Sequence, residues 1–351
     1  MYKLLIISKV SNKEEYATGY GSQFDVKHLD LLIKNYLSKN IKIKIIDYKI
    51  NIFSNLLLKY YSYVFDGILF IGLSNQQLKN IHIFKDNDLY LWGFNWLTWI
   101  NNKKDLSRFS IVFEQAFKDL SPYKNYNQKT FYMPLAFQHD RIVQNTKRIY
   151  QLAFFGTLNR DRRKNNKDYR FKILKGLLDR GISVVNFNGR SKMQSEMKYL
   201  DKLKNHNNFK VIHSFGEPED YSCCEYVLNL PFHEYGEDEN IKWGMSIDEI
   251  ENTNWLIHWE TFKCIGTRSN FITHKCEANY DIGLNDQNCH LYDSTPNDPD
   301  KIIQEVEKIV KSNLSKRIDD KTWENNTYKR RMTTIISIIK DHINRNSKNE
   351  K

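Results

Sequence analysis

Residues 151–189, QLAFFGTLNRDRRKNNKDYRFKILKGLLDRGISVVNFNG, carry the pattern that decides the fold. The apolar run 151–156 is typical of a buried strand. Residues 169–180 have their apolar side chains at helical spacing, and Gly181 follows, where a glycine commonly ends a helix. A second apolar run then covers 184–189. The order strand, helix, strand predicts two parallel strands joined by a crossover helix, the repeating unit of a doubly wound sheet.

The same alternation extends along the chain in both directions. Further apolar runs of strand length occur at 3–8, 41–47, 67–72, 89–94, 211–216, 226–232 and 270–274. The intervals between them are long enough for helices, and residues 25–37 have helical spacing. The stretch 299–345 is predicted to be mostly helical. The fold class is therefore expected to be α/β, with doubly wound parallel sheets.

Pro134 marks the expected boundary between two domains, because it interrupts regular structure in the connector 132–136. A chain of 351 residues agrees with two domains at about 150 residues each. We expect an N-terminal Rossmann-like domain over 1–133 and a C-terminal one over 134–325. A last helix with a polar tail, over 326–351, is expected to pack back toward the N-terminal domain.

The composition restricts the class of protein. The formal net charge of +11 indicates an anionic partner, which is nucleic acid, a membrane surface or a phosphorylated substrate. The five cysteines form no CxxC pair and are odd in number, so they predict reduced thiols in the cytoplasm. No apolar run reaches about 18 residues, which predicts a soluble protein and leaves peripheral membrane contact open. Walker and GxGxxG motifs are absent, which argues against a P-loop ATPase and a dehydrogenase.

The first candidate site follows the run 151–156. Gly156 and Thr157 come directly after it, so their backbone N–H groups are expected at the carboxyl edge of the sheet, where open α/β sheets bind ligands. Arg160 and Arg162 follow at the expected start of the next helix and can neutralise phosphate oxygens. Spacing alone leaves two interpretations open, a phosphate-binding loop and an ordinary solvated basic loop.

The second candidate is Glu260, which lies in the aromatic stretch 252–274, NTNWLIHWETFKCIGTRSNFITH. The aromatic residues form the core-facing stripe of a predicted helix, which Gly266 is expected to end before a strand resumes at 270–274. Glu260 is expected to point away from that stripe, near the ligand edge of the sheet. A carboxylate there can accept hydrogen bonds from the vicinal hydroxyls of a ribose. An ordinary surface glutamate is the alternative.

Six blocks of the sequence carry a resemblance to a known family. They are FYMPLAFQHD (131–140), AFFGTLNRDRR (153–163), DRGISVVNFNG (179–189), FGEPEDYSCCEYVLNLP (215–231), HWETFKCIGTRSNFIT (258–273) and TYKRRMTTII (327–336). In this order, residues 130–340 resemble the C-terminal domain of GT-B glycosyltransferases, particularly the CgeB-like group. They are similar, more distantly, to phage DNA β-glucosyltransferase. The N-terminal half resembles these enzymes only in its alternation of strands and helices.

The resemblance implies two Rossmann-like domains that face each other across a cleft, with C-terminal helices that cross back. It also implies a nucleotide-sugar donor, expected to be a UDP-sugar, bound by the C-terminal domain. The implied donor-binding residues are Gly156, Thr157, Arg160 and Arg162 at the diphosphate, Asn188, Gly189, Ser214, Phe215 and Gly216 at the base, and Glu260 at the ribose. Ile257 stands where the family has an arginine. Either His258 or Arg162 with Arg163 compensates for it, or donor affinity is reduced.

The catalytic base is expected in the N-terminal domain. Asp25 and His28 are the candidates, although an ordinary residue is the favoured interpretation of each. Asn95 stands where the phage enzyme has a catalytic aspartate, and an amide cannot act as a base. No metal or other cofactor is expected, because GT-B enzymes generally stabilise the leaving diphosphate with basic side chains and helix dipoles. The two DxD matches, at 86–88 and 298–300, are predicted to be structural.

Three functions remain open from the sequence. The first is a metal-independent glycosyltransferase that moves a hexose or pentose from a nucleotide-sugar to a hydroxyl of a surface glycan, glycolipid or protein, in the cytoplasm or at the membrane periphery. The second is the same chemistry on a hydroxymethylated pyrimidine in DNA, which the +11 charge permits. The third is a non-catalytic nucleic-acid or anion-binding protein on a degenerate GT-B scaffold, which Ile257 and Asn95 suggest.

Overall fold

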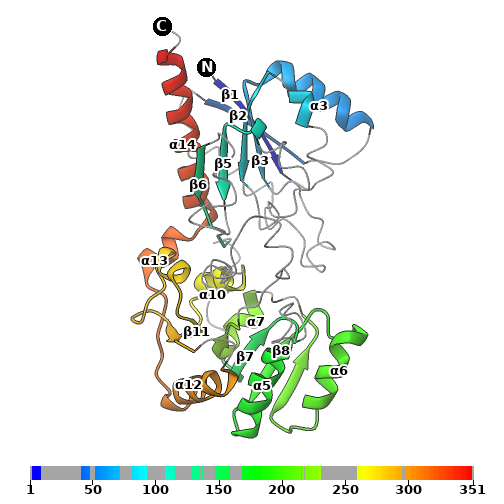
Figure 1. The fold of residues 1–351 in the computed structure, drawn as a ribbon, viewed down its shortest axis with the longest axis vertical. Coiled ribbons are helices and arrows are strands. Elements are labelled where there is room, and N and C mark those ends of the chain that lie inside the picture. Colours follow the sequence, from blue (N-terminus) through cyan, green and yellow to red (C-terminus); the bar gives the residue numbers. More distant parts are fainter. Residues whose placement is uncertain are drawn as a thin grey trace. The chain divides into compact units, whose positions relative to one another are not determined.

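The structure is a computed structural model that divides into two compact units (Figure 1). It describes residues 2–8, 41–47, 52–71, 81–84, 86–92, 107–114, 129–134, 136–137, 147–158, 168–214, 216, 218–230, 259–294 and 298–349. The first unit comprises Met1–Leu135 together with Lys329–Lys351, and the second comprises Ala136–Tyr328. Within the described residues, no helix is long and apolar enough to cross a membrane.

The first unit is built on a six-stranded parallel sheet with the order β2-β1-β3-β4-β5-β6. Its strands are β1 (Tyr2–Ser8), β2 (Ile41–Asp47), β3 (Gly67–Ile71), β4 (Asp88–Trp92), β5 (Ile111–Glu114) and β6 (Lys129–Tyr132). Its described helices are α3 (Ile52–Val64), the 3-10 helix η1 (Ile81–Phe84) and nearly all of α14 (Tyr328–Asn349). The residues of β3 are all buried, as expected of a strand with both faces covered.

Helix α14 packs on the first unit, where His342 contacts residues of β4 and β6. The ring of His342 lies 6.1 Å from the ring of Tyr90, and its Nδ1 lies 3.4 Å from Nζ of Lys129.

The Tyr2 hydroxyl packs over Gly67 so closely that a Cβ there would lie 2.1 Å from the hydroxyl oxygen. Tyr2 also donates a hydrogen bond to Asp88, which shows that this carboxylate of the first DxD match belongs to the fold, as predicted.

The second unit contains a six-stranded parallel sheet with the order β12-β11-β10-β7-β8-β9. Its strands are β7 (Tyr150–Phe155), β8 (Val184–Phe187), β9 (Phe209–Ile212), β10 (Cys224–Leu228), β11 (Phe271–His274) and β12 (His290–Tyr292). Its described helices are α5 (Tyr169–Asp179), α6 (Gln194–Leu203), α7 (Pro218–Ser222), α10 (Trp259–Thr267), α11 (Glu277–Asp281), α12 (Pro299–Ser312) and α13 (Asp320–Asn325). The chain therefore runs outward from β7 to β9 and then returns to the other side of β7, the order of a dinucleotide-binding fold.

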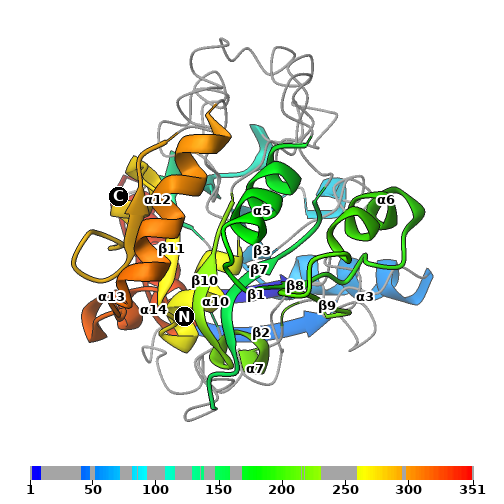
Figure 2. The ribbon, with the colours of Figure 1, turned by 90° about the horizontal axis from the view of Figure 1, so that it is seen from below.

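Helices α5 and α12 lie side by side against this sheet (Figure 2). They approach closely because Gly176 has no side chain: a Cβ at this position would lie 2.3 Å from Cδ1 of Ile303. Asp298 caps α12, since its side chain accepts the N–H of Lys301 at 3.2 Å. The predicted structural role of the second DxD match is thus confirmed for Asp298.

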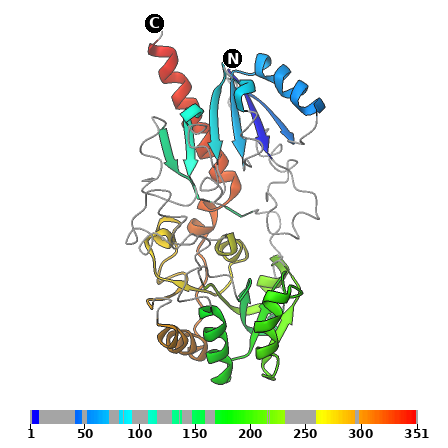
Figure 3. The ribbon, with the colours of Figure 1, turned by 45° about the vertical axis from the view of Figure 1, so that its right-hand side comes forward.

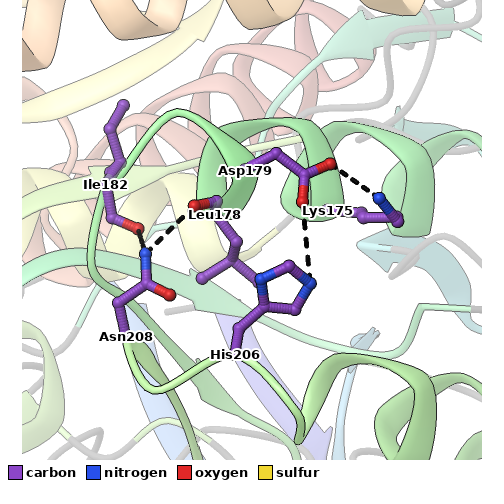
Figure 4. A network of polar contacts seen from close by, with 6 residues as sticks. All are labelled: Lys175, Leu178, Asp179, Ile182, His206 and Asn208. Carbon is purple, nitrogen blue, oxygen red and sulfur yellow. Dashed lines mark hydrogen bonds and ion pairs between the residues drawn. The ribbon is translucent and has the colours of Figure 1, made fainter.

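Polar contacts join the end of α5 to the loop before β9 (Figure 4). Asn208 Nδ2 donates to the carbonyl of Leu178 at 3.2 Å and to that of Ile182 at 2.8 Å. Asp179 accepts a hydrogen bond from Lys175 Nζ at 2.6 Å and lies 3.7 Å from Nε2 of His206. The carbonyl of Leu178 also accepts the N–H of Gly181 at 2.9 Å, so Asn208 adds a second donor there and bonds, in addition, to the carbonyl of Ile182 beyond the helix end.

Each of the nine apolar runs contains a strand, which confirms the predicted alternation. Two runs need correction: β9 ends at Ile212, so His213 and Ser214 follow the strand, and β10 ends at Leu228, so Asn229 and Leu230 follow it. The stretch 299–345 is helical, but it is divided among α12, α13 and α14. The strands β5, β6 and β12 were not predicted. The expected helix at 25–37 lies outside the described residues.

Replacing Asn208 with alanine is expected to lower the free energy of unfolding by about 1–3 kcal/mol, because the carbonyl of Ile182 loses its side-chain donor and that of Leu178 loses one of its donors. Urea unfolding followed by circular dichroism measures the change. Asn207→Ala is the matched control, since Asn207 is the preceding residue and is exposed. Equal stability of the two variants would contradict the role given to Asn208.

Candidate functional site

The candidate site lies at the carboxyl edge of the second sheet, where the strand order reverses between β7 and β10. Open α/β sheets leave a crevice at such a switch point, because the connections from the two strands depart in opposite directions. Gly156 and Thr157 follow β7, Asn188 and Gly189 follow β8, and Asn229 follows β10.

Arg170 of α5 joins the two loops on either side of this switch point. Its Nη1 donates to the carbonyl of Thr157 at 3.1 Å, and its Nη2 donates to the carbonyl of Leu230. The guanidinium carbon lies 5.3 Å from the centre of the Phe154 ring, and Arg170 is only 4% exposed. A buried cation is stable only with such partners, so Arg170 holds the ends of β7 and β10 in a fixed spacing.

Glu196 of α6 fixes the ends of β7 and β8 in the same way. Its Oε1 accepts the N–H of Leu158 at 2.6 Å and the amide of Asn188 at 2.7 Å, and the residue is 1% exposed. The amide of Asn186 donates to the carbonyls of Phe154 and Gly156 at 3.1 and 3.0 Å. These buried bonds determine the shape of the turn after β7.

The turn after β7 has two properties that suit an anionic ligand. Gly156 has a φ of +118°, which a residue with a side chain rarely adopts. The hydroxyl of Thr157 is buried and has no hydrogen-bond partner among the described residues. A buried hydroxyl without a partner costs free energy, and a ligand that bonds to it recovers that cost.

The loop after β9 is fixed by its own side chains. Ser214 Oγ donates to Asp220 at 2.5 Å and accepts the N–H of Gly216 at 3.1 Å. Gly216 has a φ of +77°, and a Cβ there would lie 3.0 Å from both Phe155 and Tyr221. A glycine is therefore required at this position.

Glu260 lies in the first turn of α10, beside α7. Burial raises the pKa of Tyr221 of α7, and the nearby Glu260 carboxylate raises it further. The Tyr221 ring stacks on that of Phe155, the last residue of β7, with centroids 3.8 Å apart. Lys263, one turn after Glu260, donates from Nζ to the carbonyl of Gly216. Glu260 therefore lies close to both the end of β7 and the loop after β9.

The structure thus brings together most of the predicted site residues that it describes. Gly156, Thr157, Asn188 and Gly189 meet because β7 and β8 are neighbours, and Ser214, Gly216 and Glu260 meet through α7 and α10. Arg160, Arg162, Phe215, His258, Asp25 and His28 lie outside the described residues. Among the described residues, no three His, Cys, Asp or Glu side chains gather as a metal site.

The predicted role of Gly266 is wrong. Helix α10 continues to Thr267, and the left-handed residue that ends it is Arg268, with a φ of 51°. Gly266 is instead required by close packing, because a Cβ there would lie 2.7 Å from Cδ2 of Phe137. Its carbonyl also accepts a hydrogen bond from the indole of Trp323 at 3.1 Å.

Solved structures resemble this chain over nearly its whole length, although neither a protein-family model nor a curated protein matches its sequence. Sucrose-phosphate synthase from Thermosynechococcus elongatus has a TM-score of 0.58 at 7% identity, covering 98% of this chain and 99% of its own. A glycosyltransferase from Rickettsia africae ESF-5 has a TM-score of 0.55 at 10% identity, covering 97% and 98%. HepE from Anabaena, solved in complex with UDP and glucose, has a TM-score of 0.50 at 11% identity, covering 99% and 100%. The fold is GT-B.

Sequence reasoning missed three residues that shape this edge of the GT-B fold, namely Arg170, Glu196 and Lys263. Two of them carried a detectable signal. Arg170 shares the buried face of α5 with Ile173 and Leu177, and Glu196 precedes the buried Leu200 of α6 by one turn. A charged residue at a core-facing position of an amphipathic helix predicts a buried polar contact.

Glu196→Ala is expected to lower the free energy of unfolding by about 2–4 kcal/mol, because the N–H of Leu158 and the amide of Asn188 lose a buried acceptor. Urea unfolding measures the change. Glu196→Gln retains an amide oxygen that accepts both bonds, so it is expected to recover at least half of the loss. An alanine variant as stable as the native protein would contradict the bracing role of Glu196.

Proposed function

We propose that this protein is a glycosyltransferase that binds a nucleotide-sugar at the carboxyl edge of its second sheet and transfers the sugar to a hydroxyl acceptor. One observation carries the proposal: Glu260, in the first turn of α10, is near Tyr221, whose ring stacks on Phe155 at the end of β7, and Lys263 of the same helix bonds to Gly216 in the loop after β9. The fold thus places a carboxylate and a buried hydroxyl, which has no partner among the described residues, on the side of the switch point of a GT-B fold.

In this proposal, the carboxylate of Glu260 accepts hydrogen bonds from the two ribose hydroxyls. Gly156 allows the diphosphate to approach the backbone, and the Thr157 hydroxyl donates to a phosphate oxygen. Arg160 and Arg162 neutralise the developing charge on the leaving diphosphate, so the reaction needs no metal and no further cofactor. Asn188, Gly189 and the loop that contains Ser214, Phe215 and Gly216 line the base pocket.

The first unit supplies the acceptor side in this proposal, with Asp25 or His28 as the base that deprotonates the acceptor hydroxyl. The acceptor is a surface glycan, a glycolipid or a protein, and the CgeB-like group is the proposed affiliation. UDP is the proposed nucleotide, supported by the fold shared with HepE, which was solved with UDP and glucose. His258 takes the phosphate-binding place that Ile257 leaves vacant.

Glu260→Ala is expected to weaken binding of a UDP-sugar by roughly tenfold to a hundredfold, because hydrogen bonds to a charged group contribute about 1.5–3 kcal/mol each. Isothermal titration with UDP-glucose, UDP-N-acetylglucosamine and UDP-galactose measures it. Glu277→Ala is the matched control, since Glu277 lies in the first turn of α11 in the same unit and is exposed.

Unchanged affinity in a folded Glu260→Ala protein would refute the ribose role. Absence of binding to any UDP-, GDP- or CDP-sugar by the folded native protein would refute the proposed function as a whole. Circular dichroism and the melting temperature establish that each variant is folded.

A further inference from the structure

Helix α3 of the first unit carries an exposed apolar face. Leu56 is 64% exposed, Leu57 46%, Tyr60 61% and Tyr63 80%. Among the described residues, all exposed large hydrophobic side chains of the first unit lie on this one helix, whereas those of the second unit are scattered over separate elements. A contiguous apolar stripe on a surface helix marks an interaction site.

The opposite face of α3 packs into the core of the first unit through Leu58 and Tyr61. The helix is therefore apolar on both sides, and its sequence IFSNLLLKYYSYV contains one charged residue, Lys59, and no acid. Ordinary surface helices have a polar outer face, and a helix that is apolar all round is buried by something. Helix α3 lies on the outer side of its unit, away from α14 (Figures 1 and 3).

The first unit, which contains α3, also carries the positive net charge of the protein. Residues 1–135 and 329–351 contain 25 Lys and Arg against 13 Asp and Glu, a formal charge of +12. Residues 136–328 contain 28 against 29, a formal charge of −1. The first unit is thus attracted to anionic surfaces, while the second unit is not.

We infer that the first unit docks on an anionic lipid surface through the exposed face of α3. Helix α3 lies in the plane of the interface, with Leu56 and Leu57 among the acyl chains, Tyr60 and Tyr63 at the headgroup level and Lys59 beside the lipid phosphates. The positive charge of the unit supplies the long-range attraction, and the apolar face supplies the short-range one.

The two observations together select a lipid over other anionic or apolar partners. Nucleic acid binds mainly through cationic and polar contacts to phosphate, which leaves the Leu and Tyr stripe of α3 without a role. A second copy of this unit would bring two charges of +12 together, and like charges repel. An anionic membrane attracts the positive charge of the first unit and also buries the apolar face of α3.

Co-sedimentation with vesicles tests this inference. The full chain is expected to bind vesicles of phosphatidylcholine mixed with phosphatidylglycerol, to bind phosphatidylcholine alone weakly, and to lose affinity as salt is raised. Leu56→Ser combined with Tyr63→Ser is expected to reduce the partition coefficient about tenfold or more. Tyr280→Ser combined with Leu314→Ser, which removes exposed side chains of the same types from the second unit, is expected to leave it unchanged.

Several results would overturn the inference. The inference is overturned if the native protein fails to bind anionic vesicles. It is also overturned if the α3 variant, shown by circular dichroism to be folded, binds vesicles as well as the native protein does. Light scattering that shows a native dimer and a monomeric α3 variant would assign the face to self-association. Binding to duplex DNA without binding to anionic vesicles would assign the charge to nucleic acid. All four of these measurements give a result whether or not the protein binds a nucleotide-sugar.

Discussion

The buried guanidinium of Arg170 is the interaction on which the second unit depends most. It bonds to the carbonyls of Thr157 and Leu230, so the two loops that leave the sheet in opposite directions share one donor. A buried charge without hydrogen-bond partners costs free energy. The two loops therefore cannot separate without exposing the guanidinium of Arg170 to water or leaving it without its acceptors. The backbone at Thr157 and at Leu230 is therefore held in place before any ligand binds, and such preorganisation reduces the entropy lost on binding.

Glu196 extends the same constraint to the neighbouring strand. With Arg170 on one side and Glu196 on the other, the turn after β7 is held by one buried cation and one buried carboxylate. Among the described residues, the hydroxyl of Thr157 is buried without a hydrogen-bond partner, and it is proposed to contact the donor together with the carboxylate of Glu260. The residues that shape the site are therefore different from the residues that are proposed to touch the donor.

Much of the fold was predictable from the sequence, because strands covered on both faces read as continuous apolar runs and helices lie between them. The strands β6 (KTFY) and β12 (HLY) mix polar with apolar residues, so they do not form apolar runs, and β5 (IVFE) offers a run of only three apolar residues. Gly266 was misread because a glycine near a helix end looks the same whether it is needed for its φ angle or for the approach of Phe137. The position of Glu260 near the edge of the sheet was predicted from the helix pattern and its ribose role from a resemblance, whereas its neighbour Tyr221 required the tertiary structure.

The proposed glycosyl transfer and the inferred membrane docking assign different tasks to the two units. The second unit, with a formal charge of −1, carries the proposed donor site, and the first unit, with +12, has the charge and the apolar helix for an anionic surface. Hydrogen–deuterium exchange with and without a UDP-sugar tests the central claim most directly. The account predicts slower exchange in peptides that contain Gly156 to Leu158, Asn188 to Arg190 and Glu260, with the rest of the second sheet unchanged. Slowed exchange only in other parts of the chain, or none at a saturating donor concentration, would contradict it.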